Sequence, residues 1–346
     1  MKKIYPAQRS RWLYLVAIIF LCLMVVGLWK STLILDKPKI DEEAKPVAVA
    51  LNSGAIEPIP LVRKLDSRKV ELGEKLFNEP KLSKDNTISC ASCHSLKTGG
   101  VDRRRYSLGV NDAIGVINTP TVFNSEFNFK MHWNGVVNTL EEQIDKPIYS
   151  ERAMASNWQE IVGKLEKSRE YTAMFDKIYR DGLNSDNIKD AIATYERSLY
   201  TPNSRFDRFL RGEGNAITEE EKEGHNRFKA YGCVSCHQGI NIGGNLFQQF
   251  GLFGNYFEER GNLTKVDLGR YNVTGQEEDR YKFRVSSLRN VELTPPYFHD
   301  GTAETLEEAV TLMGKYQLGR ELSQEDTESI LKFLKTLTGE YQGKPL

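Results

Sequence analysis

Cysteine is scarce in this chain of 346 residues, and neither sign of charge is in excess. Of the five cysteines, Cys22 lies in an apolar N-terminal run and the other four occupy two short motifs. Lys plus Arg and Asp plus Glu both number 47. A protein that binds nucleic acid through a basic face would carry a surplus of Lys and Arg. The composition therefore argues against a nucleic-acid partner.

Residues 12–29, WLYLVAIIFLCLMVVGLW, lack any charge. Eighteen helical residues at ~1.5 Å each span about 27 Å, close to the hydrocarbon thickness of a bilayer. No A-x-A-like site follows the run, which favours a retained anchor over a cleaved signal peptide. Cys22 follows Phe20 and Leu21, where a lipoprotein site would have small residues. We expect residues 1–35 to form a cytoplasmic tip and one transmembrane helix.

Positive charge precedes this run and sets its expected orientation. By the positive-inside rule the short N-terminus stays in the cytoplasm and the rest is exported. Residues 36–65 are rich in Pro and charge and have little periodicity, which is typical of a flexible linker. The sequence thus predicts an inner-membrane protein with its folded part in the periplasm. The basic residues are Lys2, Lys3, Arg9 and Arg11.

The four remaining cysteines form two CxxCH motifs. Two thiols three residues apart can form thioethers to one haem, and the adjacent histidine reaches its iron. A zinc ribbon would place its CxxC pairs much closer than these, which start 233 − 90 = 143 residues apart. A redox CxxC would not need the duplicated histidine. The motifs are CASCH (Cys90, Cys93, His94) and CVSCH (Cys233, Cys236, His237).

The two halves of the chain are related by an internal duplication. TLEE occurs at 139–142 and again at 305–308, an offset of 166 residues. NTPTVFN at 118–124 and RVSSLRN at 284–290 share that offset. The haem motifs are only 143 apart, so the second half carries about 23 extra residues. We expect the Gly- and aromatic-rich segment 243–262 to hold them as a loop.

Apolar periodicity predicts helices through most of the exported part. The sequence therefore predicts an all-α fold of two cytochrome-c-like haem domains, residues 66–215 and 216–346. Thr218 is the expected N-cap of one helix. The helical segments are expected at 68–78, 157–179, 187–199, 218–231, 305–316 and 323–337.

The duplicated TLEE frame differs at one informative position. Met313 in the second copy corresponds to Pro147 in the first, since 313 − 147 = 166. A thioether ligand on the second iron would make an electron-transfer centre, whereas proline offers no donor to the first. An isolated Met on a helix can equally be core packing. Trp133 lies in the same frame and is a candidate relay between haems, or a packing residue.

Together these residues resemble the bacterial diheme cytochrome c peroxidases and their relative, the diheme enzyme of methylamine utilisation. The resemblance covers about residues 66–346 and is far more specific than either CxxCH alone. Its carriers are KLSKDNTISCASCH, NTPTVFN, TLEEQIDKP, GCVSCHQG, SLRNVELTPPYFHDG and TLEEAVTLMG.

The resemblance implies roles for particular residues. His94 and His237 would be the proximal iron ligands and Met313 the distal ligand of the electron-transfer haem. Trp133 would lie between the haems, with Gln143 and Pro147 lining a peroxide pocket. The family also holds a calcium ion between its domains, and oxygen donors suit calcium. Its ligands would be the side chain of Asn118 and the backbone carbonyls of Thr294 and Pro296.

Two positions depart from the family pattern. Many members have a distal histidine that caps the first haem, and the corresponding residue is Val110. The first haem is therefore expected to be open in every redox state. The family's acid–base glutamate corresponds to Ala153, and loss of such a group costs about 10²–10⁴-fold in rate. Glu151 is the candidate substitute.

The leading hypothesis is a membrane-anchored periplasmic peroxidase. It would reduce hydrogen peroxide with electrons from a small cytochrome c or cupredoxin, possibly as a homodimer. The alternatives are a diheme oxidase of a protein or organic substrate, and a non-catalytic electron carrier or redox sensor. Among the remaining histidines, His225 is expected on a helix surface, His299 in a structural role, and His132 near the first haem pocket.

Overall fold

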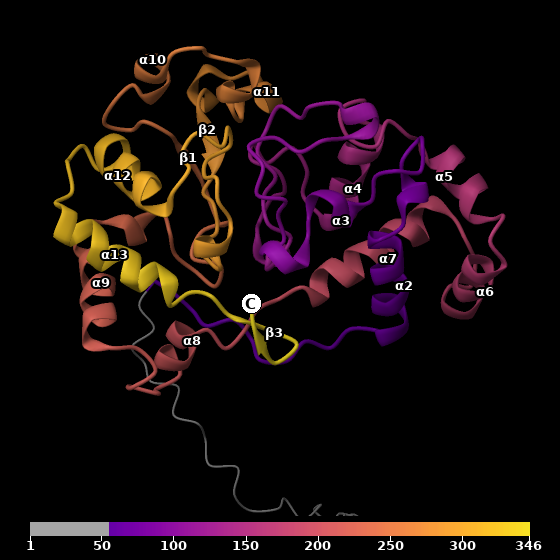
Figure 1. The fold of residues 1–346 in the computed structure, drawn as a ribbon, viewed down its shortest axis with the longest axis horizontal. Helices are drawn as coiled ribbons and strands as arrows, with labels where there is room; N and C mark the ends of the chain where they lie inside the picture. Colours follow the sequence, from indigo (N-terminus) through magenta and orange to yellow (C-terminus); the bar gives the residue numbers. More distant parts are fainter. Residues whose placement is uncertain (1–54) are drawn as a thin grey trace, which may run out of the picture. The chain divides into compact units, whose positions relative to one another are not determined.

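The structure is a computed structural model that describes residues 55–346 (Figure 1). The expected membrane anchor at 1–35 and residues 36–54 of the expected linker lie outside the described residues. Among residues 55–346, no helix combines the length and apolar character needed to cross a membrane. The helices are α2 (Ser67–Phe77), α3 (Cys90–Cys93), α4 (Leu140–Tyr149), α5 (Trp158–Leu165), α6 (Arg169–Ile178), α7 (Ser185–Ser198), α8 (Arg205–Leu210), α9 (Glu219–Ala230), α10 (Tyr256–Arg260), α11 (Tyr271–Thr274), α12 (Leu306–Gln317) and α13 (Gln324–Lys335).

The fold is mainly helical, as predicted, but the described residues also contain four short strands. β1 (Phe247–Gln249) pairs with β2 (Lys282–Arg284), and β3 (Glu340–Tyr341) pairs with β4 (Lys344–Pro345), both antiparallel. The loop expected over 243–262 is wrong in part, because β1 and α10 lie within it. The expected helix at 157–179 is two helices, since α5 ends at Leu165 and Ser168 caps α6.

Each half is built on one crossing of two helices. α2 packs across α7 in the first half, and α9 packs across α13 in the second (Figure 1). A glycine makes each close approach possible. A Cβ on Gly73 would lie 2.0 Å from the carbonyl oxygen of Ala191, and one on Gly224 would lie 2.0 Å from that of Ser329. Thr218 caps α9 with a capping box, as expected.

The ends of the described chain are exchanged between the halves. Ile56 and Ile59 are buried, and Ile56 belongs to the core of the second half and bridges to Gly239. The expected linker therefore ends before residue 55, because these apolar side chains are buried in the fold. At the other end, Tyr341 and Leu346 pack against the core of the first half. A third, aromatic cluster is centred on Phe250, Tyr256, Phe257, Phe283 and Tyr316.

Candidate active site

The first CxxCH motif forms α3, a single helical turn. The backbone N–H of Ser89 donates to the Oγ of Ser92 at 3.0 Å, which helps to fix the start of the turn. The backbone N–H of His94 donates to the carbonyl of Cys90 at 2.9 Å. Its ring Nδ1 donates to the carbonyl of Gly100 at 3.2 Å, which leaves Nε2 as the ring atom for a ligand. Burial lowers the pKa of His94, so the imidazole is neutral at pH 7.

The second motif repeats this arrangement. The backbone N–H of His237 donates to the carbonyl of Cys233 at 3.0 Å, and its ring Nδ1 donates to the carbonyl of Ile242 at 3.4 Å. Burial lowers the pKa of His237 to about 4. A neutral imidazole oriented by a backbone carbonyl is the usual form of a metal-ligating histidine.

The thiols of both motifs fit covalent haem attachment. All four are free of disulfides and half-buried, and each pair lies on one turn beside its histidine. Burial raises the pKa of Cys90 and of Cys93. These thiols are therefore not pre-ionised nucleophiles or metal thiolates. The residues present fit a c-type haem at each motif.

The two TLEE copies fold identically at their N-termini. Thr139 caps α4 and Thr305 caps α12, and each hydroxyl accepts from the backbone N–H three residues later. The carboxylates of Glu142 and Glu308 accept from the backbone N–H four residues earlier, both at 2.8 Å. Equivalent helices are thus present in both halves, as the duplication predicts.

Pro147 and Met313 occupy equivalent places in these helices. Pro147 lies inside α4 and is half-buried, as is Gln143 one turn earlier. Met313 is half-buried in α12 and packs against the aromatic cluster, together with Trp133. The ligation of iron by Met313 stays a prediction.

Trp133 joins the first half to the second. Its indole Nε1 donates to the carbonyl of Asn118 at 2.8 Å, and its own carbonyl accepts from the backbone N–H of Arg284 at 2.8 Å. Its ring meets that of His299 edge-on, with centroids 6.3 Å apart. The indole therefore packs on aromatic residues of the second half, the position that the resemblance implied.

His132 lies close to the first motif. Its backbone has a positive φ of 62°, and its Nε2 is buried without a hydrogen-bond partner. Burial lowers its pKa to about 4, with the charges of Lys146, Arg284 and His94 acting in the same direction. The influence of His94 shows that the two imidazoles are neighbours. The sequence signal was only its place beside Trp133.

The two departures from the family pattern contact each other. The backbone N–H of Val110 donates to the carbonyl of Ala153 at 2.8 Å, and Val110 is buried. A Cβ on Gly109 would lie 2.7 Å from the Cα of Ala153, so the two loops are in close contact. Glu151 is exposed, and within the described chain its carboxylate makes no hydrogen bond. Nothing in this arrangement directs Glu151 toward the first site.

The expected calcium ligands lie on segments that the structure brings together. The Nδ2 of Asn118 donates to the carbonyls of Arg104 and Arg105, and the backbone N–H of Asn118 donates to the carbonyl of His299. A Cβ on Gly301 would touch both Arg105 and Pro296. Across residues 55–346, no hydrogen bond ends on the Oδ1 of Asn118 or on the carbonyls of Thr294 and Pro296. Three oxygen atoms thus remain free for a hard cation.

A buried charge network beside Trp133 was missed by the sequence reasoning. The ring Nε2 of His299 donates to the carboxylate of Asp267 at 2.7 Å, and Arg260 pairs with both Asp267 and Asp300. These hydrogen bonds hold the pKa of Asp267 far below its usual range, although burial opposes them. The network accounts for His299 as a structural residue, as expected. Arg260 supplies the cation that makes a metal ion there unnecessary.

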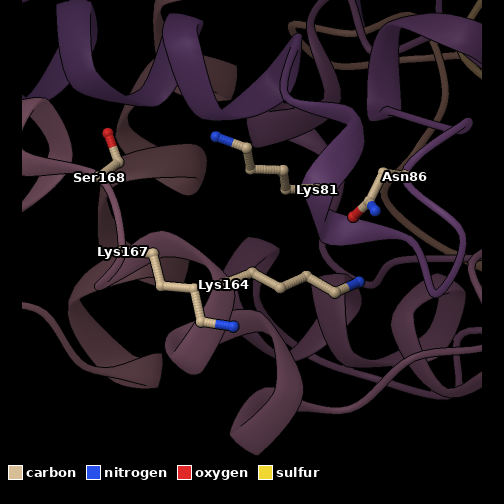
Figure 2. A pocket seen from close by; sticks show the side chains of 5 residues that line it. All are labelled: Lys81, Asn86, Lys164, Lys167 and Ser168. Carbon is tan, nitrogen blue, oxygen red and sulfur yellow. The ribbon is translucent and has the colours of Figure 1, made fainter.

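A basic pocket lies apart from these residues (Figure 2). Lys164, one of its lining residues, donates to the carbonyls of Ser83 and Lys84 and pairs with Glu160. The pocket contains neither CxxCH motif nor any of the expected site residues. Its lining residues are Lys81, Asn86, Lys164, Lys167 and Ser168.

Sequence comparison identifies close relatives. The cytochrome c peroxidase Ccp of Escherichia coli is 47% identical over 83% of this chain, which spans 61% of that relative's length. The cytochrome c551 peroxidase of Nitrosomonas europaea is 45% identical over 82% of this chain and 84% of the relative. The Pseudomonas aeruginosa cytochrome c551 peroxidase is 40% identical over 80% of each chain.

Structural comparison and a family profile agree with these relatives. A MauG-like protein associated with microbial copper homeostasis superposes with a TM-score of 0.73 at 27% identity, covering 82% of this chain and 93% of that one. The diheme peroxidase BthA of Burkholderia thailandensis shares the fold, with a TM-score of 0.68 at 17% identity over 82% and 88% of the two chains. The profile of the di-haem cytochrome c peroxidases matches residues 67–215. The chain therefore belongs to the di-haem cytochrome c peroxidase family of oxidoreductases, and its two CxxCH motifs attach two c-type haems.

Proposed function

We propose that the protein reduces hydrogen peroxide to water, with electrons from a small cytochrome c or cupredoxin. The carrying observation is the asymmetry of two structurally equivalent helices, Pro147 in α4 and Met313 in α12. The first half then provides the open site and the second half the site where electrons enter. The relatives named cytochrome c551 peroxidase support the same assignment.

The chemistry requires an open iron position and groups that orient peroxide. A c-type haem attached at the first motif supplies the iron at which peroxide binds. His94 holds that iron from one side, with its ring fixed by the carbonyl of Gly100. Pro147 presents no competing donor, and Gln143 in the same helix has an amide that can donate to a peroxide oxygen. Two electrons and two protons convert one peroxide molecule into two water molecules.

Two further groups prepare this reaction. Trp133 links the halves through its contacts with Asn118 and Arg284 and lies on the shortest covalent route between α4 and the aromatic cluster around Met313. His132 holds an unpartnered, neutral Nε2 beside the first motif. We assign Trp133 to electron transfer between the sites and His132 to the polar lining of the first.

Calcium and the membrane complete the proposal. A calcium ion at Asn118, Thr294 and Pro296 would join the two halves beside Trp133, because their free oxygen atoms come from both halves. An N-terminal anchor would keep the haem domains at the outer face of the inner membrane. The apolar run at 12–29 supports this location.

Turnover with a reduced cytochrome and peroxide tests the proposal. We expect peroxide-dependent oxidation of the cytochrome well above the rate given by a free haem peptide of the first motif. Electron paramagnetic resonance of the fully oxidised protein should show one high-spin and one low-spin haem. A rate equal to that of the peptide would reject the peroxidase assignment.

A second candidate is a diheme electron carrier or redox sensor. The observation that favours it is Ala153, which leaves the first site without the family's acid–base carboxyl. Low-spin spectra for both haems, together with no peroxide turnover, would select this function over the first.

A further inference from the structure

The duplication extends to the helices that close each half, α7 and α13. The carbonyl of Leu199 accepts from the backbone N–H of Asn124 at 2.8 Å, and that of Leu337 accepts from Asn290 at 3.3 Å. The residue pairs 199/337 and 191/329 share an offset of 138, which the close approaches at the two glycines confirm. The same offset makes Glu196 the counterpart of Leu334.

Glu196 is an acid in a place where the second half has a hydrocarbon. Its side chain belongs to a residue only 6% exposed, and its Oε2 is buried with no hydrogen-bond partner. Leu334, at 3% exposure, fills the equivalent place in the second core. An unpaired carboxyl in such a place costs several kcal/mol when ionised, so it is retained as the neutral acid.

Its charged surroundings come from three elements. Arg197 follows it in α7 and pairs with Glu141 of α4 at 2.7 Å. Cys90 of α3 is also close, because burial and then the charge of Glu196 raise the pKa of its thiol. Burial raises the pKa of Glu196 to about 8, Arg197 opposes this, and Glu141 adds to it. Arg63 pairs with Glu126, whose own buried Oε2 lacks a partner, on the far side of Arg197.

We propose that Glu196 is a redox-linked proton site that serves the first haem and has no counterpart at the second. Glu196 takes up one proton from solvent, by way of Glu141 at the surface, as one electron passes from the second site to the first. It returns that proton when the electron leaves for the oxidant. Charge on the first site is thereby balanced inside a buried core. Glu196 is a positioning residue for the charge balance rather than a group that touches peroxide.

The inference rests on the haems of the proposed function but not on peroxide turnover. The test is a spectroelectrochemical titration of each haem, without peroxide, from about pH 6 to about pH 10, either side of the carboxyl's pKa of about 8. In the native protein the midpoint potential of the first haem should fall as pH rises, and that of the second should stay constant. In E196Q and E196L the fall should disappear. E196L reproduces Leu334, so it is compatible with the packing of the helix crossing.

A matched variant separates this role from general electrostatics. Glu141→Gln removes the exposed partner of Arg197, and it should leave the pH dependence of the first potential in place. Both haems must remain attached in every variant, which the haem absorbance per chain measures. A pH dependence that persists in E196Q, or that is absent from the native protein, would overturn the inference. Failure of peroxide turnover with the titration behaving as described would reject only the peroxidase function.

Discussion

The two halves of the molecule share a backbone plan and differ in a few buried side chains. Both have a glycine-mediated helix crossing, an asparagine at positive φ (Asn124 and Asn290), and a threonine-capped helix of the TLEE frame. Duplication therefore preserved the contacts that fold each half. The chemistry was changed at single positions within that plan, such as Pro147 against Met313.

The largest effect is expected from erasing the difference between the equivalent helices. Pro147→Met places a thioether in α4 where α12 carries Met313, so it should close the first site. Peroxide turnover should fall to the level of a free haem peptide, and the high-spin signal of the oxidised protein should become low-spin. Pro147→Ala is the matched control, since alanine also lacks a donor. If P147M kept full turnover, the two helices would not be functional equivalents.

The next effect concerns an ion pair that the first half lacks. Arg289 is buried and pairs with Asp207 at 2.7 Å, whereas Phe123 occupies the equivalent position in the first half. Arg289→Ala should lower the free energy of unfolding by about 3–5 kcal/mol, because it leaves Asp207 buried without its partner. Chemical denaturation measures this loss. Arg205→Ala, which breaks an exposed pair with Glu221, should cost only about 0–1 kcal/mol.

The helix crossings should respond alike. Gly73→Ala and Gly224→Ala each force a methyl group against a backbone carbonyl, so each should destabilise the protein by about 1–3 kcal/mol. Gly163→Ala in α5 is the control, because a Cβ there meets no atom within 4 Å. That variant should be neutral or stabilising by up to about 1 kcal/mol. Unequal losses at Gly73 and Gly224, in thermal unfolding, would show that the crossings are not equivalent.

The smallest effect is a pH dependence confined to the second crossing. The ring of His225 packs between those of Phe206 and Phe333, whereas the equivalent Glu74 is exposed. Burial lowers the pKa of His225 to about 4 from 6.5. The unfolded chain therefore binds more protons between these values, and stability is lost as pH falls from about 6.5 to about 4.

His225→Phe should remove about 1–2 kcal/mol of that loss and should change little at pH 8. Melting temperatures of the two proteins across this range provide the measurement. Parallel curves for the native protein and H225F would contradict the packing of His225 as a neutral ring.

Much of the fold was predictable because the duplication is written in local patterns. The TLEE caps, the CxxCH turns and the amphipathic helices depend on neighbours a few residues apart, and these were predicted at their observed places. The strand pair β1–β2 was not, since its register joins residues 247 and 284, far apart in the chain. His225 was expected on a helix surface, but its ring is packed between two aromatic residues of other helices.

The site followed the same division. The haem-binding cysteines and histidines carry a spacing signal, so the sequence was sufficient for them. Asp267, Arg260 and Glu196 carry none, because their importance comes from burial and from partners in other elements. Only comparison of Glu196 with Leu334 across the duplicated helices could have raised the question, and that requires an offset of 138 that the haem motifs do not share.

The exchanged ends of the described chain limit how the protein can be divided. A fragment that begins at residue 216 would lack Ile56, which belongs to its own core, and a fragment that ends at residue 215 would lack Tyr341 and Leu346. Expression of either half as a separate domain therefore leaves a gap in its core. A circular permutation that joins these strands to the half they cover would be the way to obtain each haem domain alone.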